Sequence, residues 1–349
     1  DELDFDQAIY EAVRDYGHIV CFEEEDQTDP IDTSLSPTPF QKKGALAPPR
    51  KKLKVPRLFI FLCLSPWLFG IIFFTAYPMV TSFYQSFTKF NLIESPKWIG
   101  LDNFHRMFFE DDDFWKALKN TVWISAISIP LRICFAIFTA WVLTKPKRGR
   151  NIYRTIFFLP SMVPAVAGTM AFTYIFNPAY GPINKLLEAV GVDEPPFWFL
   201  DPDWSKWGLI LLGLWGIGDT MIIFLAGLLD VPKSLYEAAE LEGASGWQSF
   251  RYITLPLMTP VIFFSTVTGV IGSFQYFTQA YVASGQVNDY SHSMYFYATH
   301  IYYSAFKAYE MGYASALAWF LLVITLLCTL VILKTQKRWV HYPNGSLFK

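Results

Sequence analysis

The sequence predicts an all-α membrane protein with six transmembrane helices. Hydrophobic residues make up 53% of the 349 residues, and the mean hydropathy of +0.27 is positive, which favours a membrane protein over soluble domains. The chain contains six nearly uncharged stretches of about 20 residues, long enough to cross a hydrocarbon core roughly 30 Å thick. These predicted spans are residues 58–80, 121–144, 155–176, 207–229, 257–283 and 313–333.

The distribution of Lys and Arg predicts which loops lie in the cytoplasm. Basic residues gather before the first span in 42–57, between spans two and three in 145–154, and after span six in 334–338. Because short loops rich in Lys and Arg stay on the cytoplasmic side, both termini are predicted to lie there. The acidic loops after spans one and three are predicted to face outward. The loop 233–256 has few basic residues, but the alternation of six spans places it in the cytoplasm.

The chain divides into three predicted regions. Residues 1–54 form a cytoplasmic extension that is acidic and then basic, residues 55–340 form the transmembrane domain, and residues 341–349 form a cytoplasmic tail. The extension is interpreted as a mobile, solvated tail. A short amphipathic helix with a regulatory or partner-binding role remains an alternative, supported by apolar residues at Leu3, Ile9, Ala12, Val13 and Tyr16.

Three of the spans contain residues that are unusual inside a bilayer. Pro66 and Pro78 in span one are each predicted to kink the helix. Arg132 in span two and Asp219 in span four lie about 11 or 12 residues from the outer ends of their spans, roughly 17 Å deep. Since intramembrane charges mark paired or functional sites, we hypothesise that these two residues pair, or that one lines a pathway. The alternative is that Arg132 snorkels or faces a partner chain.

A short external helix is predicted between spans three and four, in residues 181–191. Pro182 begins this helix and Gly191 ends it. Its apolar residues form one stripe, at Ile183, Leu186, Leu187 and Val190. The stripe would suit a position on the membrane surface or beneath a docked protein.

The loop 233–256 is a polar segment between two apolar spans. Ser234 with Glu237, and Ser245 with Gln248, both fit the capping-box pattern, which predicts two short helices joined by a turn. Gly243 in that turn permits a left-handed backbone. On this evidence the loop is either a docking surface or simply a well-capped helical hairpin.

Two motifs then indicate a family. The loop resembles the EAA loop of binding-protein-dependent ABC importer permeases at Glu237, Ala238, Ala239, Gly243, Leu255 and Pro256. The stretch 98–104 resembles a W-x-G-L-x-N-F variant that sugar permeases place after their first span. The resemblance implies the type I ABC importer permease fold over about residues 58–340, in the branch typified by maltose, lactose and glycerol-phosphate systems. It also implies that the loop inserts into a cleft on a separate ATP-hydrolysing subunit, with Glu237 facing a basic group there.

Small, polar and aromatic residues on spans four and five are candidates for a substrate pathway. These residues are Trp215, Gly216, Asp219, Thr220, Ser273, Gln275 and Tyr276. Tight helix packing through small residues is the alternative explanation. The resemblance implies that Trp215, Gly216, Thr220, Ser273 and Tyr276 contact sugar in mid-membrane. This sequence has Gly213 and Ser273 where maltose-type relatives carry amides, so the sugar stays open.

The sequence contains no phosphate-binding Gly-x-x-x-x-Gly-Lys-Ser/Thr motif, no metal-spaced His or Cys cluster and no nucleophile arrangement. We therefore predict no catalytic residue, no metal and no cofactor on this chain. The resemblance places ATP and Mg²⁺ on a partner ATPase dimer. It further implies a second homologous permease, an extracytoplasmic binding protein, a sugar or oligosaccharide substrate, and a bacterial cytoplasmic (inner) membrane.

The sequence leaves two alternatives to an importer permease. An ion-coupled secondary transporter would work without an ATPase and would need a titratable pathway residue such as Asp219. A membrane receptor or scaffold would use the acidic extension and the polar loop for binding alone. No inverted repeat, which would favour the secondary transporter, is evident in the sequence.

Overall fold

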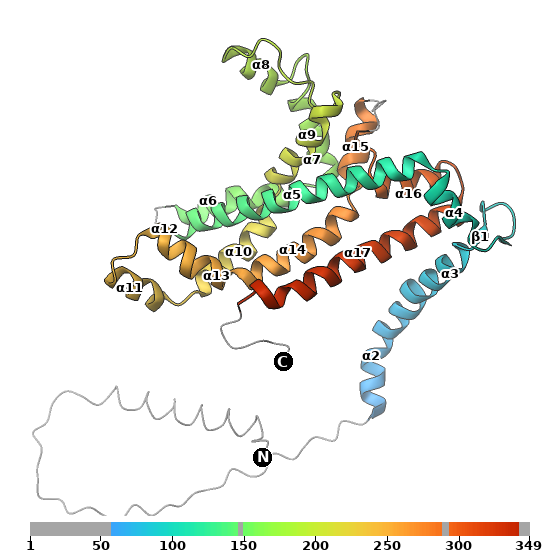
Figure 1. Ribbon diagram of the computed structural model, residues 1–349, viewed down its shortest axis with the longest axis horizontal. Helices are drawn as coiled ribbons and strands as arrows, with labels where there is room; N and C mark the ends of the chain where they lie inside the picture. The colour runs from blue at the N-terminus through green and yellow to red at the C-terminus, as the bar shows by residue number, and fades with distance from the viewer. Residues whose placement is uncertain (1–56, 146–148, 288–292, 342–349) are drawn as a thin grey trace, which may run out of the picture. The chain divides into compact units, whose positions relative to one another are not determined.

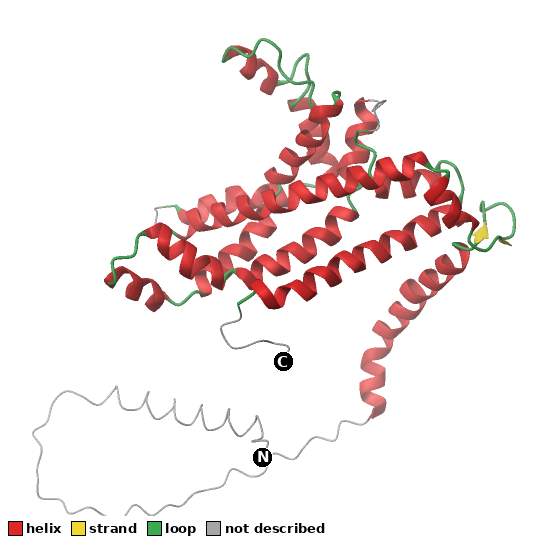
Figure 2. Ribbon diagram, in the orientation of Figure 1, coloured by secondary structure: helices red, strands yellow, loops and turns green. Residues whose placement is uncertain are grey.

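The computed structural model describes residues 57–145, 149–287 and 293–341. In these residues the chain is helical apart from turns and one two-stranded hairpin (Figure 2). Contacts divide the chain into Asp1–Cys63 and Leu64–Lys349, and the elements described below belong to the second unit except for the start of the first helix. The predicted extension and nearly all of the predicted tail lie outside the described residues.

Length and apolar composition identify four described helices that could cross a membrane, or up to six spans if two bent helix pairs each count as one. These elements coincide with the six predicted stretches. The first span runs through α2 (Arg57–Ile71), the π-helix η1 (Ile72–Ala76) and α3 (Tyr77–Gln85). The wide π turn ends two residues before Pro78, whose ring would collide with the preceding turn of an ordinary α-helix.

A hairpin and a short helix follow the first span. Strand β1 (Thr88–Lys89) pairs antiparallel with β2 (Lys97–Trp98), and α4 (Asp102–Phe109) comes next (Figure 1). Asn103 is buried and donates its side-chain N–H groups to the carbonyl oxygens of Ser86 at 2.9 Å and Thr88 at 3.0 Å. The stretch 98–104, which resembles the sugar-permease motif, therefore also closes the turn at the end of span one.

Helix α5 (Asp112–Thr144) is the central element of the fold. It packs against α10 (Gly218–Asp230) and α14 (Thr259–Phe274), and α14 also packs against α17 (Met311–Trp339). Apolar side chains between α5 and α10 form a buried cluster that includes Ala136, Ala140, Met221 and Phe224. Small residues on α5 let α10 approach closely, as in other membrane helix pairs.

Predicted spans three and four are each formed by a bent helix pair, which the sequence analysis did not predict. Span three consists of α6 (Arg150–Phe158), the 3₁₀ turn η2 (Leu159–Met162) and α7 (Ala165–Ile175), and it bends by 99°. Span four consists of α9 (Pro202–Trp215) and α10, bent by 50°. The first break contains Pro160 and Pro164, which lack a backbone N–H. The second lies at Gly216, which favours a helix end.

The remaining helices form the two ends of the bundle. At the outer end by the predicted orientation these are α8 (Pro182–Ala189), α15 (Thr278–Val287) and α16 (Tyr297–Phe306). The loop 233–256 contains α11 (Lys233–Leu241), α12 (Gly246–Ser249), the π-helix η3 (Phe250–Thr254) and the start of α13 (Leu255–Leu257).

The helix predicted at 181–191 is confirmed as α8, and its external location stays a prediction. Pro182 is its first residue, and Gly191 follows it with φ of +90°. Its apolar stripe is divided, because Ile183 and Leu187 pack on a buried cluster while Leu186 and Val190 are exposed.

Candidate functional site

The loop 233–256 has the predicted form of two short helices joined by a turn. Gly243 in the turn has φ of +79°, a left-handed conformation that L side chains rarely adopt. At the start of α12, the Ser245 N–H donates to Gln248 Oε1 at 2.7 Å and the Gln248 N–H donates to Ser245 Oγ at 3.4 Å. The second predicted capping box is therefore confirmed.

The first predicted capping box is wrong. Helix α11 begins at Lys233, so Ser234 lies inside its first turn, and the residue before the helix is Pro232, which makes no side-chain capping bond. A Pro in that position fixes the backbone before the helix and leaves no capping role for Ser234. Glu237 is therefore free of a capping role and is exposed on α11 beside Ala238.

The loop is attached firmly to the membrane helices. The hydroxyl groups of Tyr236 and Thr254 lie 2.8 Å apart, joining α11 to the buried side of η3. Phe250 packs against Trp141 of α5 and against Trp247 of α12. A displacement of the loop would therefore be transmitted to α5 and, through the chain itself, to α10 and α14.

The loop exposes large apolar side chains that the sequence analysis missed. Leu241 is 91% exposed, Tyr252 74% and Trp247 71%. Apolar residues of this size, exposed in a polar loop, favour contact with another protein. Their place in an otherwise polar loop is the signal that could have identified them. Of the coupling candidates, Ala239, Leu255 and Pro256 are half-buried against the body of the chain.

A cavity of about 400 Å³ lies between α5, α9, α10 and α14. Four of the predicted pathway residues line it, namely Thr220, Ser273, Gln275 and Tyr276, and so does Arg132. Further polar and small residues of the lining are Ser128, Gly213, Ser265, Thr268, Gly269, Gly272, Thr278 and Gln279.

Trp215, Gly216 and Asp219 are not among the lining residues. Trp215 instead packs its ring on Phe172 and lies 3.5 Å from the position that a side chain on Gly168 would take. This contact holds α9 against α7. Trp215 lies before the bend, so its packing on α7 accounts for its position, whereas Asp219 lies in the first turn of α10, after the bend.

Arg132 and Asp219 form no ion pair among the described residues. Arg132 Nη2 instead donates to the Gly216 carbonyl oxygen, at 3.5 Å, a distance at the limit of a hydrogen bond. That carbonyl belongs to the residue at the end of α9, where helical carbonyls have no partner in their own helix. This geometry does not support the hypothesis that Arg132 and Asp219 pair. The other possibility, that one of them lines a pathway, stays a prediction.

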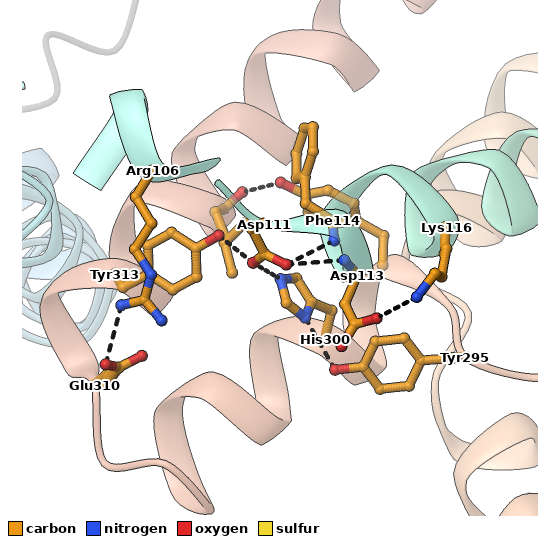
Figure 3. A network of polar contacts seen from close by, with 11 residues as sticks. Arg106, Asp111, Asp113, Phe114, Lys116, Tyr295, His300, Glu310 and Tyr313 are labelled. Atoms are coloured by element: carbon orange, nitrogen blue, oxygen red, sulfur yellow. Dashed lines mark hydrogen bonds and ion pairs between the residues drawn. The ribbon is translucent and has the colours of Figure 1, made fainter. Parts of the chain in front are cut away.

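A polar network absent from the sequence analysis joins three helices at one end of the bundle (Figure 3). Asp111 caps α5 by accepting from the N–H groups of Asp113 and Phe114. Its other oxygen accepts from Tyr313 of α17 and lies 3.0 Å from His300 Nε2 of α16. His300 Nδ1 lies 2.9 Å from the Tyr295 hydroxyl.

The charges in this network have defined causes. Burial alone would raise the pKa of Asp111, but the Tyr313 hydrogen bond, His300 and the two capping N–H groups hold it below its usual value. Burial lowers the pKa of His300 against the opposing effect of Asp111. Arg106 of α4 pairs with Glu310 at 3.0 Å, which raises the pKa of Arg106 although burial opposes it. Around neutral pH the site therefore holds an ionised Asp111 beside a neutral His300.

Comparison with known proteins identifies the chain. Residues 132–339 match the family described as "Binding-protein-dependent transport system inner membrane component". The chain is 42% identical over 284 residues to the probable ABC transporter permease protein YesP of Bacillus subtilis, covering 80% of this chain and 91% of YesP. It is 35% identical over 225 residues to the lactose transport system permease protein LacF of Rhizobium radiobacter, covering 63% and 74% of the two chains.

The fold has a solved counterpart. A chain of a bacterial ABC transporter involved in the import of the acidic polysaccharide alginate matches with a TM-score of 0.68 and 23% identity, over 80% of this chain and 96% of that one. The family match covers more than half of the sequence, and it contains α10, the loop 233–256, and α14 to α17. The chain therefore belongs to the family of binding-protein-dependent transport system inner membrane components.

Proposed function

We propose that this chain is a permease subunit of an ATP-driven importer that moves a sugar or oligosaccharide across a bacterial inner membrane. The observation that carries the proposal is that α5, α10 and α14 join the cavity to the loop 233–256. A partner that moves the loop would thereby change access to the cavity. The relatives described as ABC transporter and lactose transport permeases support the type of energy source and the class of substrate.

Coupling is assigned to the exposed part of the loop. Glu237, Ala238 and Gly243 would contact a cleft on a separate ATPase, while Ala239, Leu255 and Pro256 support the loop from beneath. ATP and Mg²⁺ belong to that partner, and closure of its dimer would push the loop and switch the cavity between outward and inward access. This is the alternating-access mechanism that a broken, jointed helix arrangement permits.

The complete transporter would contain this chain, an ATPase dimer, a second homologous permease and an extracytoplasmic binding protein. In this arrangement the chain has six spans with both termini in the cytoplasm. The cavity residues Thr220, Ser273, Gln275 and Tyr276 would contact the sugar, since hydroxyl and amide groups pair with sugar hydroxyls and aromatic rings pack on sugar faces. Asp219, Trp215 and Gly216 would act near the hinge of span four. The ion-coupled alternative draws no support from the family or from the relatives.

The test is to purify the complex gently through this chain and to identify its subunits by mass spectrometry. ATP hydrolysis is then measured in bilayers with candidate binding proteins and sugars. We expect an ATPase subunit and a sister permease to co-purify, and a loaded binding protein to stimulate hydrolysis. A chain that transports alone, without nucleotide, would contradict the proposal.

A further inference from the structure

The cavity contains one formally charged side chain among the described residues that line it. Ser128, Thr268, Ser273 and Gln275 are neutral, and Arg132 carries a positive charge. Arg132 lies 12 residues before the end of α5 at Thr144, roughly 18 Å along the helix. A guanidinium at that depth is costly to hold unless an anion or a set of acceptors faces it.

The chain compensates this charge only in part, because Asp219 of α10 attracts Arg132 from beyond ion-pair distance. A guanidinium has five N–H donors, and the hydrogen bond found for Arg132 is the 3.5 Å contact with the Gly216 carbonyl. No carboxylate of the described residues lies within ion-pair distance of Arg132, and Asp219 is absent from the cavity lining. The side chain is exposed in the isolated chain. Most of its donor capacity is therefore available to a ligand in the cavity.

A second polar group of the lining also has no partner. The Ser265 hydroxyl on α14 is buried, with the residue 7% exposed, and makes no hydrogen bond in the described part of the chain. A buried hydroxyl without a partner costs free energy unless a ligand or water completes it. The residue belongs to the cavity lining, but its hydroxyl oxygen is enclosed, so Arg132 on α5 is the polar side chain with donors available to a ligand.

We propose that the substrate is an acidic sugar, a uronic acid or an oligosaccharide of uronic acids, whose carboxylate binds Arg132. The inference rests on the proposed transport function and specifies its substrate class. Arginine forms two parallel hydrogen bonds with a carboxylate, which fixes orientation as well as charge. The volume of about 400 Å³ lies within the range of small-ligand pockets, roughly 300–1,000 Å³. The Gln275, Thr268 and Ser273 side chains would hold the sugar hydroxyls.

A neutral sugar would leave the cavity lining with one positive charge and with no anion inside the cavity, since Asp219 attracts Arg132 from outside the lining. A structural role for Arg132, in which it only holds the break of span four through Gly216, uses one weak hydrogen bond out of five donors. Such a role would affect every substrate equally. The two roles are therefore separated by comparing an acidic sugar with its own neutral counterpart.

The experiment uses the complete transporter, isolated with its partners as above, in proteoliposomes with ATP. Its probes are radiolabelled disaccharides of galacturonate, glucuronate and mannuronate, each paired with the neutral disaccharide made by reducing its carboxyl groups. Uptake ratios of acid to neutral sugar are measured for wild type, Arg132→Gln and Arg132→Lys. Because the binding protein is the same throughout, a change in the ratio comes from the permease.

We expect wild type to carry at least one acid about tenfold or more faster than its neutral partner. Arg132→Gln should lower that ratio about tenfold, and Arg132→Lys, which keeps the charge without the planar fork, should lower it less. If wild type carries the neutral sugar as fast as the acid in every pair, the inference is overturned, and no variant is needed to decide it. Equal loss for both sugars in Arg132→Gln would assign Arg132 to structure. Absence of ATP-dependent uptake of every acid would overturn the inference, while the proposed function would still be judged by the co-purified ATPase and by stimulated hydrolysis.

Discussion

His300 Nε2 lies 3.0 Å from Asp111 Oδ2, although the two residues are 189 positions apart in the chain. Both side chains are nearly buried, with 7% and 14% of their surface exposed. Because Asp111 also caps α5 and accepts from Tyr313, this contact ties α5, α16 and α17 together at one end of the bundle (Figure 3). The site is a structural joint, and we expect its loss to lower the free energy of unfolding.

Removing either partner of this joint should destabilise the fold. In Tyr313→Phe and His300→Ala the Asp111 carboxylate loses a buried hydrogen bond, which costs roughly 1–3 kcal/mol of the free energy of unfolding. The thermal unfolding of the purified chain in detergent measures the effect. Lys116→Ala serves as the control, since Lys116 pairs with Asp113 on the exposed surface nearby and such pairs contribute little. Equal shifts in the control and in Tyr313→Phe would contradict the assignment.

The same joint predicts how stability depends on pH. The folded chain holds the pKa of His300 below its ordinary value of 6.5, so protons bind the unfolded chain more readily. The stability due to His300 is therefore fully present above about pH 6.5 and is lost as the pH falls toward the lowered pKa. Asp111, whose pKa is lowered from 3.8, acts in the same direction in a more acidic window.

Unfolding temperatures measured from about pH 8 to pH 5 should decline below pH 6.5 in wild type. His300→Gln, which does not titrate, should flatten this decline. His105→Gln is the matched control, since His105 lies in an exposed pair with Glu110. A decline of unchanged slope in His300→Gln would show that another group is responsible.

Gly243→Asp should abolish stimulation of ATP hydrolysis by a loaded binding protein while the chain still inserts and folds. No described residue lies within 4 Å of a side chain at this position, so the internal cost is the left-handed backbone alone, about 1–2 kcal/mol. The loss would therefore come from contact with the ATPase. Gly191→Asp carries the same kind of backbone strain on the opposite side, with φ of +90° and open space, and should keep full stimulation. Normal stimulation in Gly243→Asp would contradict the role of the loop.

Leu241→Ser and Trp247→Ala should weaken co-purification of the ATPase without lowering the thermal stability of this chain. Both side chains are exposed on the loop, so their removal costs the isolated fold little, whereas large apolar anchors often dominate an interface. Ile93→Ser is the control, because Ile93 is 89% exposed in the loop between β1 and β2. Mass spectrometry of the purified complexes gives the subunit ratio. An unchanged ratio in both loop variants would exclude these residues from the interface.

Signals that are local in the sequence predicted the structure well. Apolar length located the four long helices and the two bent helix pairs that the structure gives as span candidates. The Ser245 and Gln248 spacing and the left-handed Gly243 predicted the turn of the loop, because caps and turns depend on a few neighbouring residues. Polar and aromatic residues at helical spacing on spans four and five likewise indicated four residues of the cavity lining, which are Thr220, Ser273, Gln275 and Tyr276.

Features that depend on distant contacts were not predicted. The Asp111–His300 joint unites residues that no spacing relates. Trp215 lies outside the cavity because it packs on Phe172 of α7, and Asp219 lies outside it after the bend between α9 and α10. Pro160 and Pro164 mark the first break in the sequence. Hydropathy measures the length of an apolar stretch and not the direction of the helix axis, so it predicted one continuous span there.

Gly218, the first residue of α10, lies against the turn that interrupts predicted span three. A side chain on Gly218 would approach the Phe158 Cα and the Ser161 Oγ to 2.8 Å and the Phe157 carbonyl oxygen to 3.0 Å. Two of these atoms belong to the backbone of span three, which cannot yield as a flexible side chain does. Glycine is thus required for α10 to start against the turn of span three.

Gly218→Ala should therefore destabilise the chain by about 1–3 kcal/mol, the usual cost of overpacking. Gly213→Ala is the matched control, because Gly213 lies within α9 with nothing in 4 Å of an added side chain. Replacing a helical glycine by alanine there should leave stability unchanged or raise it by up to about 1 kcal/mol. Thermal unfolding of both variants in detergent gives the comparison. If Gly218→Ala unfolds at the temperature of wild type, the two breaks do not touch as the structure shows, and a hinge between spans three and four would have to be placed elsewhere.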